Sequence, residues 1–144
     1  MKLKQISVFM ENQPGRLAEM ASSLGNAGIN IMALTVAEST DFGVVRMIVK
    51  DFEKAMKILK DKKFTVRETE VLAVEIADQP GSLGKVLKVF AENDLNVEYM
   101  YAFVSRRQDA LIVFRFDDIE KAIAVMKKSG IKVLTNEEVL ALTK

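Results

Sequence analysis

The hexapeptide NQPGRL at residues 12–17 recurs as DQPGSL at residues 78–83, at an offset of 66 residues. An asparagine stands 18 residues after the start of each copy, at Asn30 in GINI and at Asn96 in DLNV. Similar segments at a fixed offset indicate tandem copies of one structural unit. The 144-residue chain is therefore predicted to contain two modules, residues 1–70 and 71–144.

The first module alternates strand and helix signals. Apolar and β-branched residues predict strands at residues 3–10, 29–38 and 44–50 and from residue 64. The spacing of Leu17, Met20 and Leu24 predicts an amphipathic helix, and Pro14 suits its first position because proline lacks the N–H that would stay unpaired there. Asp51 is expected to cap a second helix.

The second module repeats this order. Strands are predicted at residues 72–77, 95–104 and 110–116. The segment DIEKA at 118–122 mirrors DFEKA at 51–55 with an offset of 67, so one extra residue is expected in the hairpin loop at residues 105–109. Each module then reads β-α-β-β-α-β, an α+β ferredoxin-like fold with an antiparallel sheet and both helices on one face.

Composition excludes several classes of function. The chain is 49% hydrophobic and 28% charged with a net charge of +1, which does not favour a nucleic-acid partner. No apolar run approaches the roughly 20 residues of a membrane span, so no membrane partner and a cytoplasmic location are expected. The absence of histidine and cysteine removes the commonest metal ligands and general bases, so we expect no metal, no cofactor and no enzymatic activity.

The repeated strand, the N/D-x-P-G-x-L segment, the helix and the asparagine resemble a tandem pair of ACT domains over nearly the whole chain. ACT domains are small-molecule sensor modules attached to many enzymes of amino-acid metabolism. The resemblance implies an amino acid effector beside the loop between the first strand and first helix, often at an interface between modules. It places one ligand site at Asn12, Gln13, Pro14, Gly15, Asn30 and Ile31 and the other at Asp78, Gln79, Pro80, Gly81, Asn96 and Val97.

Elementary chemistry is compatible with these sites. Backbone N–H groups at a helix N-terminus suit a carboxylate, and glycine allows close approach. The side-chain oxygen of Asn12 or Asp78 can accept from an ammonium group, and Asn30 or Asn96 can complete a site in the same or a neighbouring module. The formal charge of Asp78 predicts tighter ammonium binding at the second site. Turn formation and capping are alternative roles for all of these residues.

The sequence favours a stand-alone regulatory protein that senses an amino acid or similar small molecule. Modules of about 70 residues bury too little surface to be robust alone, so a homodimer is expected. A partner enzyme would then respond to the effector. The alternative is a non-catalytic subunit resembling the small subunit of a branched-chain amino acid synthase, and a small enzyme using Asp or Lys is a third class.

Overall fold

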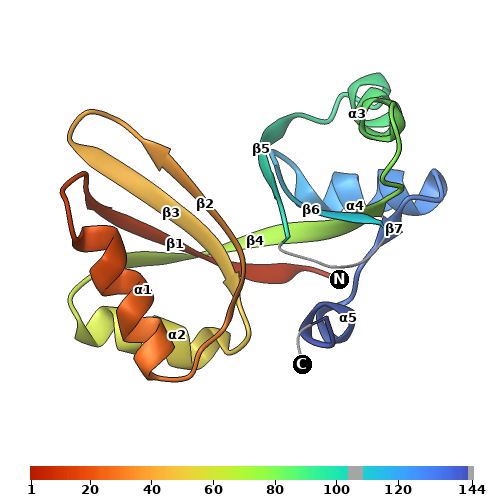
Figure 1. Ribbon diagram of the computed structural model, residues 1–144. Helices are drawn as coiled ribbons and strands as arrows, with labels where there is room; N and C mark the ends of the chain where they lie inside the picture. Colours follow the sequence, from red (N-terminus) through yellow and green to blue (C-terminus); the bar gives the residue numbers. More distant parts are fainter. Residues whose placement is uncertain (104–108, 143–144) are drawn as a thin grey trace. The chain divides into compact units, whose positions relative to one another are not determined.

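A computed structural model describes residues 1–103 and 109–142 (Figure 1). The chain divides into two compact units. The N-terminal unit is Lys4–Thr69, and the C-terminal unit is Met1–Leu3 with Glu70–Lys144. Each unit is described by itself below.

The N-terminal unit contains the predicted β-α-β-β-α-β order. Its elements are β1 (Leu3–Glu11), α1 (Arg16–Asn26), β2 (Ile31–Glu38), β3 (Phe42–Val49), α2 (Phe52–Asp61) and the first part of β4 (Thr65–Ile76). The strand order is β2-β3-β1-β4, and β3 is antiparallel to both of its neighbours. The Asp51 carboxylate accepts a hydrogen bond from Lys54 N at 3.2 Å, which confirms the predicted cap of α2.

The C-terminal unit repeats the same topology. After the second part of β4 come α3 (Ser82–Glu92), β5 (Val97–Ala102), β6 (Ala110–Phe116), α4 (Ile119–Lys128), β7 (Lys132–Val133) and α5 (Asn136–Leu140). The strand order is β5-β6-β4-β7, with antiparallel pairing throughout. The predicted α+β fold is thus confirmed.

Some predicted boundaries differ. The strands expected from residue 64 and at 72–77 form one continuous 12-residue strand, β4, because the segment between them contains no glycine or proline to interrupt it. Strand β5 begins at Val97 rather than at residue 95, because Leu95 N still donates to Phe90 O at the end of α3. Of the predicted extra residue at 105–109, all but position 109 lies outside the described residues.

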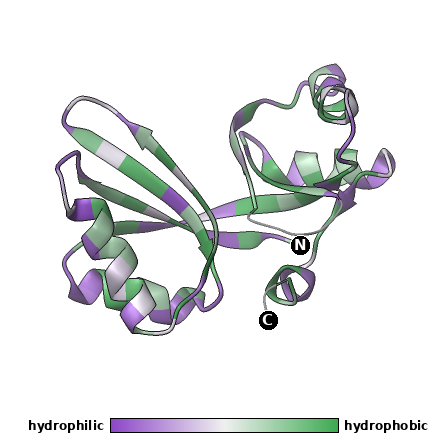
Figure 2. Cartoon of the chain, in the orientation of Figure 1, coloured by the Kyte–Doolittle hydropathy of each residue, from purple (hydrophilic) through white to green (hydrophobic). Residues whose placement is uncertain are grey.

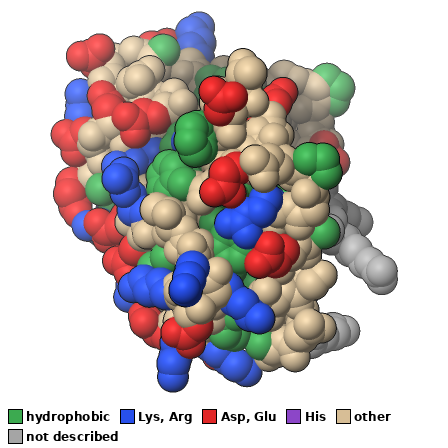
Figure 3. Space-filling model, turned by 90° about the vertical axis from the view of Figure 1, so that its left-hand side faces the viewer, with side chains coloured by type: hydrophobic (Ala, Val, Ile, Leu, Met, Phe, Trp, Pro, Cys, Tyr) green, Lys and Arg blue, Asp and Glu red, His purple; other side chains and the backbone are tan. Residues whose placement is uncertain are grey.

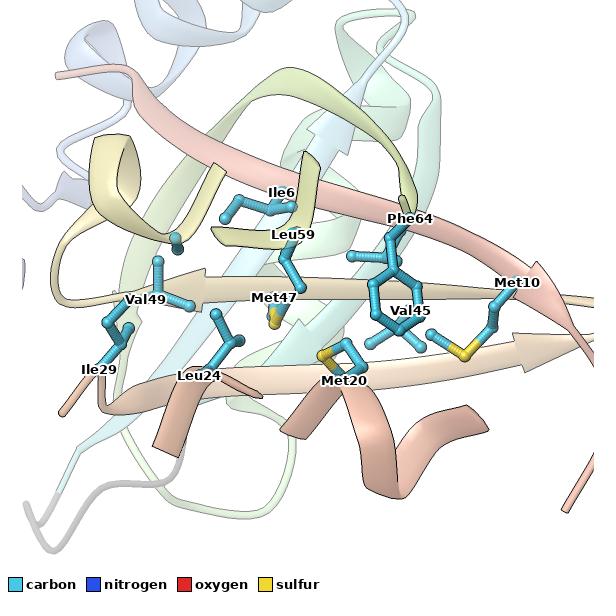
Figure 4. Close-up of a cluster of buried hydrophobic side chains, with 12 residues drawn as sticks. Ile6, Met10, Met20, Leu24, Ile29, Val45, Met47, Val49, Leu59 and Phe64 are labelled. Carbon is cyan, nitrogen blue, oxygen red and sulfur yellow. The ribbon is translucent and has the colours of Figure 1, made fainter. Parts of the chain in front are cut away.

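Each unit has its own apolar core between sheet and helices. In Figure 4, Met20 and Leu24 of α1 and Leu59 of α2 lie over the side chains of β3. The hydropathy colouring of Figure 2 shows both helices of this unit with mixed apolar and polar surfaces, as amphipathic helices require. The burial of these apolar faces is what holds each helix on its sheet.

The two cores differ in their aromatic content. Positions occupied by Leu24, Met47 and Val49 in the N-terminal unit are occupied by phenylalanine in the C-terminal unit: Phe90, Phe114 and Phe116. The Phe90 ring meets the other two edge-on, with centroid separations of 5.4 and 5.0 Å. This geometry is the preferred one for aromatic pairs.

The loop between β1 and α1 corrects the predicted role of Pro14. Helix α1 begins at Arg16, not at the proline, and its N-cap is Gly15 with φ +90° and ψ −18°. Arg16 N donates to Gln13 O at 3.4 Å, so Gln13, Pro14, Gly15 and Arg16 form a type II β-turn. Proline sets the second turn position and only glycine tolerates the third, which explains the PG pair.

The C-terminal unit repeats this turn. Gly81 is the N-cap of α3 with φ +88°, and Ser82 N donates to Gln79 O at 3.1 Å. Pro80 is therefore also a turn residue and not the first residue of the helix.

We expect Gly15→Ala to destabilise the protein by about 1–2 kcal/mol, because an L-residue at this left-handed angle is strained. A new Cβ would meet nothing within 4 Å, so the loss is conformational and not steric. The matched control is Gly25→Ala within α1, where a Cβ is also unobstructed, and there a gain of about 0.5–1 kcal/mol is expected. Urea unfolding measures both free energies; equal effects of the two substitutions would contradict the assigned turn.

Candidate functional site

The loops at residues 12–15 and 78–81 have the same hydrogen-bond pattern. In the first, Gln13 N donates to Glu11 O at 2.9 Å and Glu19 N to Gly15 O at 2.9 Å. In the second, the corresponding bonds join Gln79 N to Ala77 O at 3.0 Å and Lys85 N to Gly81 O at 3.1 Å. The predicted residues Asn12 to Gly15 and Asp78 to Gly81 are therefore brought together, each set on one exposed turn.

The helices that follow these loops lack side-chain caps. No side chain caps the N-terminus of α1 or α3, since the N-cap is glycine in both. The other helices in the described part of the chain are capped by Asp51, Asp118 and Thr135. Helix N-termini carry unpaired N–H groups and a positive partial charge, and a side-chain cap normally satisfies one of these groups. The two loops thus leave donors available that the rest of the chain covers.

Apolar side chains are exposed beside each loop. Leu17 and Leu83, which are equivalent at the 66-residue offset, are 43% and 37% exposed in the first turn of α1 and α3. Leu34 and Val36 of β2 are also exposed, and their register with Met47 and Val45 places them on the helix side of the sheet. Figure 3 shows one face of the molecule, with apolar side chains exposed among interspersed acidic and basic ones. Backbone donors beside apolar surface suit a small molecule with an anionic group and an apolar part.

Asn12 is held by the C-terminal end of β2. Its Nδ2 donates to Glu38 Oε2 at 3.0 Å and to Ser39 O at 3.2 Å. A carboxylate therefore lies beside the first loop although Asn12 itself is neutral. The charge difference between Asn12 and Asp78 no longer ranks the two sites for ammonium binding. Residue 104, the counterpart of Glu38, lies outside the described residues.

Arg16 forms a cluster at the first loop that the sequence analysis missed. Its Nε donates to Glu11 at 2.9 Å, its Nη1 to Glu19 at 2.8 Å, and its guanidinium carbon lies 4.4 Å from the centroid of the Phe64 ring. The pKa of Glu11 lies below its ordinary value because its carboxylate accepts hydrogen bonds from its own backbone N–H and from Arg16. The pKa of Arg16 is raised, chiefly by its bond to Glu19. The i,i+3 spacing of Arg16 and Glu19 was the available sequence signal.

Asn30 lies far from Asn12 within its own unit. Asn12 contacts the C-terminal end of β2, whereas Asn30 immediately precedes the N-terminal end of the same strand. Eight residues of extended chain separate Asn30 from Glu38, about 26 Å at ~3.3 Å per residue. One amino acid cannot contact both asparagines of a single module.

Asn30 and Asn96 have the same backbone role. Lys50 N donates to Asn30 O at 3.0 Å, and Asp117 N donates to Asn96 O at 3.2 Å. The strand register shifts just after each asparagine, between Ile31 and Ala33 in β2 and between Val97 and Tyr99 in β5. Ile31 and Val97 are half-buried and pack against the cores, so their structural role is plain.

A lysine stands near each asparagine. Lys54 Nζ donates to Ala27 O at 3.0 Å, and Lys121 Nζ donates to Asp94 O at 3.4 Å, in both cases at the end of the preceding helix. These equivalent lysines were missed because their contacts are to backbone carbonyls distant in sequence. A cation there suits the negative end of the helix dipole.

The chain matches a known family over most of its length. A family model described as an ACT domain pair matches residues 1–143. The chain belongs to this family. The sequence resemblance to tandem ACT domains is thereby confirmed, and the two units are the two halves of an ACT domain pair.

Individual relatives share this architecture. The probable acetolactate synthase small subunit of Archaeoglobus fulgidus is 25% identical over 157 residues, which cover 96% of this chain and 95% of that protein. The crystal structure of protein BT0572 from Bacteroides thetaiotaomicron is 39% identical with a TM-score of 0.92, covering 99% and 98% of the two chains. The ligand-free regulatory subunit of aspartate kinase from Thermus thermophilus, 16% identical with a TM-score of 0.62 over 88% and 90% of the chains, shares the fold.

Two further searches of the ACT domain pair concern sites of other kinds. Within residues 1–103 and 109–142, no group of three or more Asp and Glu side chains is placed to hold a metal ion. Within the same residues, no helix combines the length and apolar character needed to cross a membrane.

We expect Arg16→Ser to raise the pKa of Glu11 toward its ordinary value, although only in part, because the backbone hydrogen bond remains. Since the folded-state pKa is lowered, ionised Glu11 stabilises the folded state above its unfolded-state pKa, and this contribution is lost as the pH falls through the folded-state pKa. Carboxyl ¹³C NMR titration of both proteins measures the midpoint. Exposed Glu53 serves as the internal control, and an unchanged Glu11 midpoint in the variant would contradict the assigned contact.

Proposed function

We propose that this ACT domain pair is a cytoplasmic, non-catalytic regulatory protein that binds a free amino acid and signals to an enzyme of amino-acid metabolism. The modules are residues 1–70 and 71–144, and the binding loops are residues 12–15 and 78–81. Membership of the ACT domain pair family supports the class of protein. The similarity to a probable acetolactate synthase small subunit supports a partner enzyme.

The observation that carries the proposal is the pair of uncapped helices that begin at left-handed glycines. An α-carboxylate can accept hydrogen bonds from N–H groups that no side chain covers, with favourable dipole orientation. The carboxylates of Glu38 and Asp78 are suited to the ammonium group. Exposed Leu17 and Leu83 suit an apolar side chain on the effector.

The separation of loop and asparagine constrains how such a site is completed. Because Asn30 lies at the opposite end of β2 from Asn12, an effector held by both kinds of residue must contact two modules. We propose that the second module belongs to another copy of the chain, so that the protein acts as a homodimer. Effector binding then changes the stability of the dimer, and the partner enzyme responds to that change.

A second candidate function is a constitutive subunit that binds its enzyme with empty loops. The similarity to a probable acetolactate synthase small subunit over 95% of that protein favours it. The discriminating feature is the response to free amino acids, which a constitutive subunit would lack.

We expect one free amino acid to raise the unfolding temperature selectively when each of the twenty is tested against the purified protein. Binding to the folded state adds about 2.7 kcal/mol of stability at a 100-fold excess over Kd. Asp78→Ala should reduce the shift, because it removes the proposed ammonium partner. Substitution of exposed Glu92 at the far end of α3 by alanine is the matched control and should leave the shift intact. No shift with any amino acid would favour the constitutive subunit.

A further inference from the structure

We propose that Arg16 keeps the N-terminal loop filled by the protein's own side chains, so that the effector binds only at the C-terminal loop. This inference rests on the proposed function, because it concerns which of the two loops is used. The internal contact of Arg16, however, is measurable without any effector.

Arg16 crosses the start of α1 and connects three elements of the N-terminal unit. Its two ion pairs join Glu11 at the end of β1 to Glu19 in the first turn of α1, with N–O distances of 2.9 and 2.8 Å. Phe64, which precedes β4, lies under the guanidinium and is 4% exposed. Arg16 is the only guanidinium of the described chain recorded with two carboxylate partners and an aromatic ring. Charge-assisted bonds to a planar, stacked guanidinium are among the stronger surface contacts.

The charge at this loop opposes an incoming carboxylate. Glu11, Glu19 and Glu38 supply three negative charges around a single guanidinium. A ligand carboxylate at the start of α1 would be a fourth anion beside a cation that is already paired twice. Like charges at this separation disfavour binding, and breaking either ion pair would add to the cost.

The C-terminal loop lacks every part of this cluster. The positions of Glu11, Arg16 and Glu19 are occupied by Ala77, Ser82 and Lys85 at the 66-residue offset. Lys85 lies in the first turn of α3, where Glu19 lies in α1. A lysine at this position favours a carboxylate at the helix N-terminus, whereas a glutamate opposes it. The repeated backbone therefore carries opposite electrostatics at its two loops.

Arg16 has an alternative role as the anchor of the ligand carboxylate, and substitution separates the two roles. If Arg16 fills the site, Arg16→Ser opens it; if Arg16 is an anchor, the same change removes binding there. Arg16→Lys keeps the charge but cannot bridge two carboxylates with one planar group, so it should behave like the serine variant.

Isothermal titration with the amino acid that gives the largest thermal shift tests the inference. We expect one bound amino acid per chain in the native protein, two in Arg16→Ser, and one in Lys57→Ser, which removes the same charge from an exposed position of α2. The triple variant Ala77→Glu, Ser82→Arg, Lys85→Glu transfers the cluster to α3 and should weaken binding at least tenfold. Two sites in the native protein, or loss of a site in Arg16→Ser, would overturn the inference.

Amide hydrogen exchange of the ligand-free protein keeps the inference testable if no amino acid binds. We expect slower exchange at residues 16–20 than at the equivalent residues 82–86, and severalfold faster exchange at 16–20 in Arg16→Ser. Unchanged exchange in that variant would overturn the Arg16 contact itself. A protected loop with no amino acid bound would count against the proposed function alone.

Discussion

The left-handed backbone at Gly15 and Gly81 is the constraint on which the rest of each unit depends. With φ near +90°, these residues turn the chain from the end of a strand into the start of a helix within one β-turn. The turn sets where the apolar stripe of the helix begins and therefore how α1 and α3 pack on their sheets. It also replaces a capping side chain by a glycine. The same geometry that closes the fold leaves the helix N-terminus open to a ligand.

The two units combine a repeated backbone with different side chains. The turn bonds, the strand shift after each asparagine and the lysine contact at the helix end all recur at offsets of 66 or 67 residues. The cores differ by three phenylalanines, and the loops differ in charge through Arg16, Glu19, Ser82 and Lys85. A tandem pair with equal folds and unequal loops can separate the tasks of binding and assembly. We therefore regard the unequal loops as the central feature of the ACT domain pair.

The sequence predicted the fold because its signals are local and occur twice. The PG pair, the helical spacing of Leu17, Met20 and Leu24, and the Asp51 cap each depend on residues a few positions apart. The role of Pro14 was wrong by two residues, because a type II turn and a helix N-terminus both accept proline before glycine. Capping by Thr135 with Glu138, a capping box, was not foreseen either, although its spacing is legible in the sequence.

The site was harder to predict because its contacts are distant in sequence. Nothing local indicates that Glu38 reaches Asn12 or that Arg16 lies over Phe64. The distance along β2 between Asn30 and the loop follows only from the strand direction. A site that needs both groups must be shared between modules, which the sequence left open.

The most direct test of this account is complementation between two variants that are each defective in binding. If the loop of one copy and the asparagine of another form the site, mixing Asp78→Ala with Asn96→Ala regenerates one intact site in each mixed dimer. We predict that neither variant alone binds the effector and that the refolded mixture recovers binding at about one quarter of the native capacity, since about half of randomly assorted dimers are mixed. A mixture that binds no better than its components would contradict a site shared between copies of the chain.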